Sequence, residues 1–163
     1  MTPSTLSEPE FLARFGPVYE ASPWVAEAVW PHAQAGALDA PQAMAAAMRA
    51  VVERAPKDAR LALIRAHPEL ASRARMADAS VREQSGAGLD QCSAEEFDAF
   101  QRLNGAYNTR FGHPFIVAVK GLGRADILAA FESRLANDPE TEFETAMAEI
   151  HKIAGFRIAD LFA

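Results

Sequence analysis

The sequence lacks several features that would assign it to common classes of protein. Cys92 is the only cysteine in 163 residues, which excludes an internal disulfide and a zinc site built from cysteines, and fits a reducing compartment. The longest uncharged apolar run, residues 114–119, is far shorter than the roughly 20 residues of a membrane-spanning helix. The first twenty residues hold no apolar stretch of signal-peptide length. We therefore expect a cytoplasmic protein with no membrane partner.

Positive charge is also in short supply. The chain has 16 Lys and Arg against 22 Asp and Glu, a formal net charge of -6, so we expect no nucleic-acid partner. The composition is otherwise that of a globular domain, with 50% hydrophobic and 23% charged residues, and it includes 35 alanines but few runs of Val, Ile or Thr. This predicts an all-α fold: a compact single-domain helical bundle of about eight helices over residues 1–163, with one short extended segment.

Capping and breaking residues give the expected helix boundaries. We expect capping boxes at Ser7 and Ser93, helix starts set by Ser22 and Asp39, and a helix end at Gly112. The predicted helices cover about residues 8–15, a stretch beginning at 23, 41–55, 57–66, a short turn around 80–84, 94–111, 124–135 and 139–162.

The last predicted helix places an arginine among apolar residues. Its apolar positions recur at helical spacing, and they are Phe143, Met147, Ile150, Ala154 and Leu161. Arg157 occupies the missing step of this stripe. A guanidinium on a buried face must be paired, because it stays charged at any ordinary pH. Arg157 is therefore either half of an internal salt bridge or a group that binds an anion.

His67 stands at a predicted corner of the chain. Pro68 biases the backbone of His67 away from the helical region, so the preceding helix ends there and the imidazole is held on a rigid turn. Histidine exchanges a proton near neutral pH, and such a turn can present it to a cavity as an acid or base. A surface histidine at a helix end is the structural alternative.

Ser80, Glu83 and Gln84 share one face of a short predicted helix, at positions i, i+3 and i+4. Ser80 and Glu83 also have the spacing of a capping box, which explains the pattern without any ligand. The two interpretations are compatible, because a capped helix start that lines a pocket can hold polar ligand atoms.

Residues 111–121 form the one stretch predicted to be extended. Its backbone has no evident sheet partner, so its peptide groups must pair with a short strand, with water or with a ligand. His113 is either a turn residue or has a side role in binding. His67 and His113 lack any recognised metal-ligand spacing, so we expect no metal site.

Several short motifs, taken in order along the chain, resemble those of one family. They are Ser22-Pro23-Trp24, His67-Pro68-Glu69-Leu70-Ala71, Ser80 with Glu83-Gln84 and Ala87-Gly88-Leu89, Leu103-Asn104 with Tyr107, Phe111-Gly112 with Pro114-Phe115, and Ile153-Ala154 with Arg157. In this order and spacing the sequence resembles the 2-oxo-4-hydroxy-4-carboxy-5-ureidoimidazoline (OHCU) decarboxylases over nearly the whole chain. Glu69, where Asp is frequent, and His113, where an apolar or aromatic residue is usual, depart from the family pattern.

The resemblance implies a function and a set of site residues. It implies an all-helical homodimer, without metal or organic cofactor, that converts OHCU to (S)-allantoin in urate degradation. The catalytic residues it implies are His67 as acid or base, with Glu83 and Arg157. The implied contacts to this small-molecule substrate are Pro68, Ser80, Val81, Arg82, Glu83, Gln84 and Arg157, with backbone groups of Phe115, Ile116, Val117, Ala118 and Val119.

Two functions of other kinds stay open at the level of sequence. One is a helical protein-binding module without catalysis, and the other is a hydrolase acting on a related ureido compound. The binding module explains the helices equally well. It does not explain why Arg157, His67 and the pair of Ser80 and Glu83 all break the ordinary pattern within one small domain.

Overall fold

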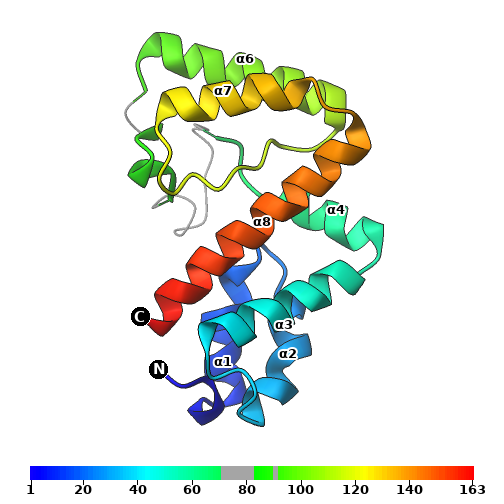
Figure 1. The fold of residues 1–163 in the computed structure, drawn as a ribbon, viewed down its shortest axis with the longest axis vertical. Coiled ribbons are helices and arrows are strands. Elements are labelled where there is room, and N and C mark those ends of the chain that lie inside the picture. Colours follow the sequence, from blue (N-terminus) through cyan, green and yellow to red (C-terminus); the bar gives the residue numbers. More distant parts are fainter. Residues whose placement is uncertain (71–82, 90–91) are drawn as a thin grey trace. The chain divides into compact units, whose positions relative to one another are not determined.

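The computed structural model describes residues 1–70, 83–89 and 92–163, which form helices joined by short loops (Figure 1). The helices in chain order are η1 (Pro3–Thr5), α1 (Glu8–Phe15), η2 (Gly16–Val18), α2 (Trp24–Gln34), α3 (Pro41–Arg54), α4 (Lys57–Ala66), α6 (Ala94–Phe111), α7 (Arg124–Leu135) and α8 (Pro139–Phe162). Residues 83–86 are also helical. These described ranges contain no β-strand, so the predicted all-α fold is confirmed. None of their helices is long and apolar enough to cross a membrane.

The chain divides into two compact units. The first consists of Met1–Ala66 together with Ile150–Ala163, and the second of His67–Glu149. In the first unit, α2 packs against both α1 and α3. Its core contains the stacked rings of Phe11 and Phe15, with centroids 4.7 Å apart, and the fully buried side chains of Met44 and Met48. The α2 helix, which contacts both α1 and α3, thus helps to bury apolar residues of each.

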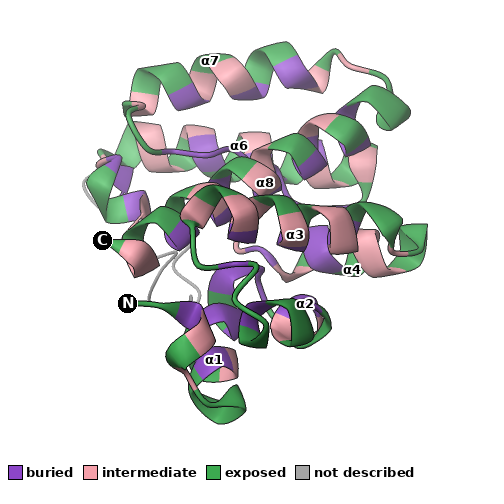
Figure 2. Cartoon of the chain, turned by 60° about the horizontal axis from the view of Figure 1, so that its bottom comes forward, coloured by how far each residue is buried: buried purple, intermediate pink, exposed green. Residues whose placement is uncertain are grey.

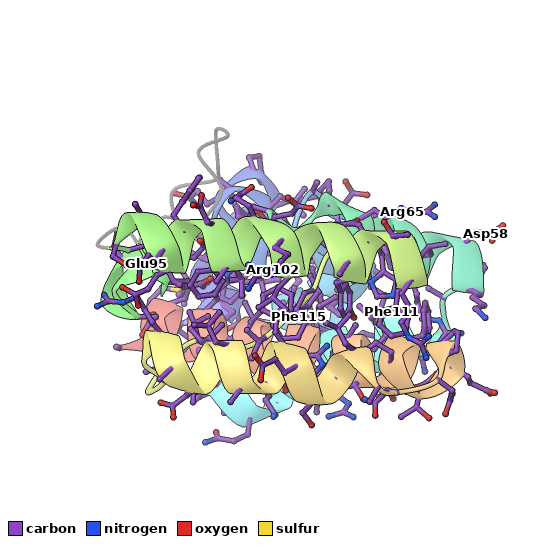
Figure 3. The ribbon with its side chains drawn as sticks, turned by 90° about the horizontal axis from the view of Figure 1, so that it is seen from above. Asp58, Arg65, Glu95, Arg102, Phe111 and Phe115 are labelled. Atoms are coloured by element: carbon purple, nitrogen blue, oxygen red, sulfur yellow. The ribbon has the colours of Figure 1, made fainter. Side chains whose placement is uncertain are left out.

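The second unit is built around α6, α7 and the segment that connects them. Residues 114–119 run extended from the end of α6 back toward the start of α7, and every one of them is buried (Figures 1 and 2). Phe111 and Phe115 lie between the two helices (Figure 3). Phe115 stacks on Phe131 of α7 with ring centroids 3.8 Å apart. The predicted extended segment therefore exists and fills the core between α6 and α7.

Three local signals act as the sequence predicts. At the start of α6, the Ser93 hydroxyl oxygen accepts a hydrogen bond from the Glu96 N–H over 3.1 Å, and the Glu96 carboxylate accepts one from the Ser93 N–H. Glu10 likewise accepts a hydrogen bond from the N–H of Ser7 before α1. Gly112 ends α6 with a φ of 73°, a left-handed conformation that favours glycine.

Two predicted helix starts are wrong in detail. Ser22 does not cap α2, because its hydroxyl donates to the carbonyl of Glu20 over 2.9 Å. Asp39 does not cap α3, which begins after Ala40, because the Asp39 carboxylate accepts two hydrogen bonds from Ser4. In both cases a polar side chain has a better partner outside its own helix.

The α8 helix turns its predicted apolar stripe inward. Phe143, Met147, Ile150 and Ala154 are buried, and Leu161 is half-buried near the end of the helix. Arg157 lies on the same stripe and its residue is only 9% exposed. The prediction of a buried guanidinium is confirmed, and its partners decide between the two interpretations of it.

Candidate active site

The corner that carries His67 directly follows the last residue of α4 and is held by two asparagines of α6. Asn104 donates from Nδ2 to the carbonyl of Leu70 over 2.9 Å, and Asn108 donates from Nδ2 to the Glu69 carboxylate over 2.5 Å. His67 is 8% exposed, so it is not the surface histidine of the structural alternative. The chain after His67 is therefore held by Pro68, by the hydrogen bond of Asn104 to the Leu70 carbonyl and by that of Asn108 to the Glu69 side chain.

The segment that carries Glu83 and Gln84 is hydrogen-bonded, through Gly88, to Arg124 at the start of α7. Gln84 is buried and Glu83 is half-buried. Gly88 follows with a φ of 77°, and its carbonyl accepts a hydrogen bond from Nη1 of Arg124 over 2.9 Å. The positive φ favours glycine, and a Cβ atom here would lie 2.9 Å from that nitrogen, so the flexible end of Arg124 would have to shift. The other predicted site residues of this region, Ser80, Val81 and Arg82, lie outside the described residues.

Two side chains bind the backbone of the extended segment. Arg134 of α7 donates from Nη1 to the carbonyl of Ile116 over 2.5 Å, and the Glu149 carboxylate of α8 accepts a hydrogen bond from the N–H of Ala118 over 3.2 Å. The sequence predicts a strand, water or a ligand as partners for this backbone. Side chains of α7 and α8 instead satisfy two of its buried peptide groups, as burial requires.

Arg134 is itself held by a buried carboxylate. Glu142 is fully buried and accepts hydrogen bonds from Arg134 Nε over 2.7 Å, from the Tyr107 hydroxyl over 2.5 Å and from the Asn137 amide over 3.0 Å. The guanidinium carbon also lies 4.3 Å from the centroid of the Phe115 ring. Burial and the hydrogen bond to Glu142 raise the pKa of Tyr107, so its hydroxyl stays protonated and donates. These contacts give Arg134 one fixed orientation toward the segment.

Three of the predicted site segments contribute to one hydrophobic cluster of the second unit. Its members include Leu70 from the corner of His67 and Ala87, which follows Glu83. The extended segment contributes Phe115, Val117 and Val119. The structure therefore brings these three segments together around a shared core. Arg157 belongs to the first unit.

Arg157 is paired within the first unit. Its Nη1 lies 2.9 Å from Oε2 of Glu20 and also donates to the carbonyls of Val18, over 3.2 Å, and Pro17, over 3.4 Å. The two side chains are 9% and 10% exposed, so the ion pair is buried. The internal salt bridge, one of the two interpretations of Arg157, is present. Contact of Arg157 with a substrate stays a prediction.

The α8 helix also contacts the segment of residues 17–20, which Arg157 binds, through a second side chain, His151. Its Nδ1 lies 2.8 Å from the Tyr19 hydroxyl oxygen, and its Nε2 lies 4.0 Å from Oε1 of Glu53. Burial, and to a lesser degree the positive charge of Arg49, lowers the pKa of His151 to about 4, and burial raises the pKa of Tyr19. At neutral pH the His151 ring is uncharged and can accept a hydrogen bond from Tyr19.

Because the His151 side chain is only 6% exposed, we expect a loss of stability in mild acid. The folded-state pKa of His151 lies below the ordinary value of 6.5, so over this range the unfolded chain binds more protons than the folded one. We expect the free energy of unfolding to fall by about 2 kcal/mol between pH 7 and pH 5 on account of this group. Denaturant unfolding of wild type and His151→Gln across this range measures the effect, with His32→Gln, at an exposed position of α2, as the control. An equal pH dependence in wild type and His151→Gln would contradict the assignment.

His113 is a buried residue of the second unit. Its Nδ1 lies 3.0 Å from the carbonyl oxygen of Pro114, and its ring contacts those of Tyr107 and Phe111. These contacts agree with a turn residue that packs in the core. Among the residues that the structure describes, no group of three or more His, Cys, Asp or Glu side chains is arranged to hold a metal ion.

Several residues that hold the site were not singled out by their local pattern. Glu142, in the first turn of α8, looks like an ordinary acid at a helix N-terminus, and Glu149 looks like a solvated charge on the same helix. Asn104 entered only as part of a family motif. The available signal for it is a polar residue at an inward position of α6, at helical spacing between buried Phe100 and Tyr107.

Comparisons with known proteins extend over most of the chain. Residues 4–159 match the family model described as OHCU decarboxylase. The 2-oxo-4-hydroxy-4-carboxy-5-ureidoimidazoline decarboxylase of Haloferax volcanii is 42% identical over 158 residues, which cover 97% of this chain and 92% of that relative. A crystal structure of (S)-allantoin synthase is similar with a TM-score of 0.79 at 33% identity, over 98% of this chain and 52% of that one. A crystal structure of OHCU decarboxylase in the presence of (S)-allantoin has a TM-score of 0.73 at 25% identity, over 96% of this chain and 99% of that one.

These similarities define the class of the protein, which is a carboxy-lyase with an all-helical fold. More particularly, the chain belongs to the OHCU decarboxylase family.

Proposed function

We propose that this chain removes the carboxylate of OHCU and protonates the resulting intermediate to give (S)-allantoin, with His67 as the proton donor. Family membership and the decarboxylase relatives support the reaction. The observation that carries the role of His67 is its place in the fold, as a buried imidazole on a corner held by Asn104 and Asn108. An imidazole that is shielded from bulk water and held in one orientation can protonate one face of a substrate.

The proposed chemistry consists of one bond cleavage and one proton uptake. The bond between the ring carbon and the carboxylate breaks, carbon dioxide leaves, and the electron pair moves into the neighbouring C=N group of the ring. The resulting enol takes a proton from His67 at the carbon that bears the ureido group, which becomes the stereocentre. Its hydroxyl becomes a carbonyl, and the hydroxyl proton passes to the ring nitrogen that received the electron pair. The substrate supplies its own electron sink, so we propose no cofactor.

Further residues have supporting roles in this proposal. Glu83 orients the substrate hydroxyl or the imidazole of His67, and Arg157 holds an anionic or carbonyl oxygen. The remaining proposed contacts are Pro68, Ser80, Val81, Arg82, Gln84 and the backbone of residues 115–119.

The reaction is tested with freshly generated OHCU. We expect the protein to accelerate release of carbon dioxide and to give one enantiomer of allantoin, because a fixed acid protonates one face. Ring hydrolysis without carbon dioxide release would identify a hydrolase instead. A protein that changes neither the rate nor the optical activity of the product would be a binding module.

We further propose that residues 1–163 act as one domain, that two copies form a homodimer, and that the protein works in the cytoplasm. The uninterrupted α8 helix, which contributes to both units, supports one domain. The family resemblance supports the dimer, and the single cysteine supports a reducing compartment. A single cooperative thermal transition, and a mass near twice 17.6 kDa by light scattering, test the first two points.

A further inference from the structure

Within the part of the chain that the structure describes, residues 115–118 are hydrogen-bonded along only one of the two edges of the extended segment. In an extended chain, the N–H and C=O of one residue point to the same edge, and successive residues alternate between the edges. The Ile116 carbonyl binds Arg134 and the Ala118 N–H binds Glu149, so both engaged residues belong to one edge. Phe115 and Val117 therefore point their backbone groups to the other edge.

On this second edge the Val119 carbonyl accepts from the N–H of Leu122, but the backbone groups of Phe115 and Val117 have no partner in the part of the chain that the structure describes. Neither the N–H nor the C=O of Phe115 or Val117 takes part in a hydrogen bond there. Phe115 is 1% exposed and Val117 is 8% exposed. Buried peptide groups are nearly always paired in folded proteins, so this edge suits a ligand that brings its own donors and acceptors.

We propose that Glu149 and Arg134 are positioning residues, which hold one edge of the segment through Ala118 and Ile116 so that the opposite edge, at Phe115 and Val117, binds the amide groups of the substrate. This inference rests on the proposed function, because that function supplies a ligand with ring amide and ureido groups. Such groups carry N–H donors beside C=O acceptors, as the backbone edge does. Successive residues of one edge are about 6.7 Å apart, so the ring and the ureido chain can each meet one residue.

The edge of Ile116 and Ala118 is rigid because of the contacts of Arg134 and Glu149, the two side chains that bind it. Arg134 is fixed by the fully buried Glu142 and by the Phe115 ring, and it donates to Ile116 from a separate nitrogen. Glu149 supplies an acceptor from α8. Two hydrogen bonds, at residues two positions apart, restrict sliding and rotation of the segment. Less conformational freedom is therefore lost when a ligand binds.

The first test maps the edge directly. We would titrate the ¹⁵N-labelled full chain with (S)-allantoin and follow the backbone amide resonances. The N–H signals of Phe115 and Val117 are expected to move downfield as they become hydrogen-bonded, while that of Ala118 changes less because Glu149 already binds it. A shift at Ala118 with none at Phe115 and Val117 would overturn the assignment of the edges.

The second test separates the hydrogen bond of Glu149 from its charge. Glu149→Leu removes the acceptor for Ala118, and we expect the Kd for (S)-allantoin and the KM for OHCU to rise about five- to tenfold while kcat changes less than twofold. Glu149→Gln keeps an amide oxygen that accepts from Ala118, so it is expected to restore both constants to within twofold of wild type. Glu144→Leu and Glu144→Gln, at an exposed position of the same helix, are the matched controls.

Three outcomes of these experiments count against the proposal in different ways. Wild-type affinity in Glu149→Leu, or equal losses in Glu149→Leu and Glu149→Gln, would overturn the positioning role. Failure of the wild-type protein to produce allantoin would overturn the proposed function itself. The tie between Glu149 and Ala118 is tested without any ligand, because exchange of the Ala118 amide proton is expected to accelerate in Glu149→Leu and not in the Glu144 controls.

Discussion

Replacing His67 with asparagine is expected to abolish most of the enantioselective formation of allantoin while the fold is retained. Asparagine keeps hydrogen-bonding groups but cannot exchange a proton near neutral pH. Positioned proton transfer contributes about 10²–10⁴-fold to a rate, and we expect kcat to fall by that order. The rate of carbon dioxide release measures the fall in kcat, and the optical activity of the product measures the loss of enantioselectivity.

The matched control for this variant is His32→Asn, which changes an exposed histidine of α2. It is expected to behave as wild type in both assays. Circular dichroism and the Tm of His67→Asn establish that the protein is folded. Near-wild-type turnover by folded His67→Asn would remove this residue from the chemistry.

Replacing Arg157 with methionine is expected to destabilise the protein strongly. The buried ion pair with Glu20 means that this change leaves a carboxylate stranded in a site that is 10% exposed. Removing one partner of a buried pair costs about 3–5 kcal/mol, and the Tm should fall by about 10 °C. The double variant Glu20→Gln/Arg157→Met lacks the stranded charge and should recover part of the loss. Equal stability of Arg157→Met and wild type would show that the pair contributes little.

The same two variants test whether Arg157 also contacts the substrate. A lost charge-assisted hydrogen bond is worth about 1.5–3 kcal/mol, so kcat/KM should fall at least tenfold in Arg157→Met, assayed well below its Tm. The double variant should regain stability without regaining kcat/KM, because the guanidinium is still absent. Recovery of wild-type kcat/KM in the double variant would restrict Arg157 to its structural role.

The helix boundaries could be predicted where they depend on neighbouring residues. The capping box of Ser93 and the left-handed Gly112 act through contacts three or four residues away, which a local pattern reveals. Asp39 was expected to act locally as well, but its carboxylate binds Ser4, 35 residues earlier in the chain. A polar side chain with a distant partner gives no local sign of that partner.

The candidate site shows the same division between local and distant causes. Pro68 acts on the residue next to it, so the corner of His67 could be predicted from the sequence. The periodicity of α8 showed that Arg157 must be paired, but its partner Glu20 lies 137 positions away and only the tertiary structure identifies it. The contacts of Arg134 and Glu149 with the extended segment likewise depend on how α7 and α8 pack.

The buried carboxylate of Glu142 also constrains how this sequence can diverge. Tyr107, Arg134 and Asn137 all donate to it where the side chain has no exposure, so replacing any one of them alone leaves the charge short of a partner. At coupled positions of this kind, changes in the free energy of unfolding are not additive. The stability lost in the first replacement is regained only when a second replacement follows. We therefore expect the four positions to change as a set, either keeping this polar combination or exchanging it together for apolar residues of similar volume. A designer who wishes to reshape the segment after α6 has to redesign these four positions as one unit.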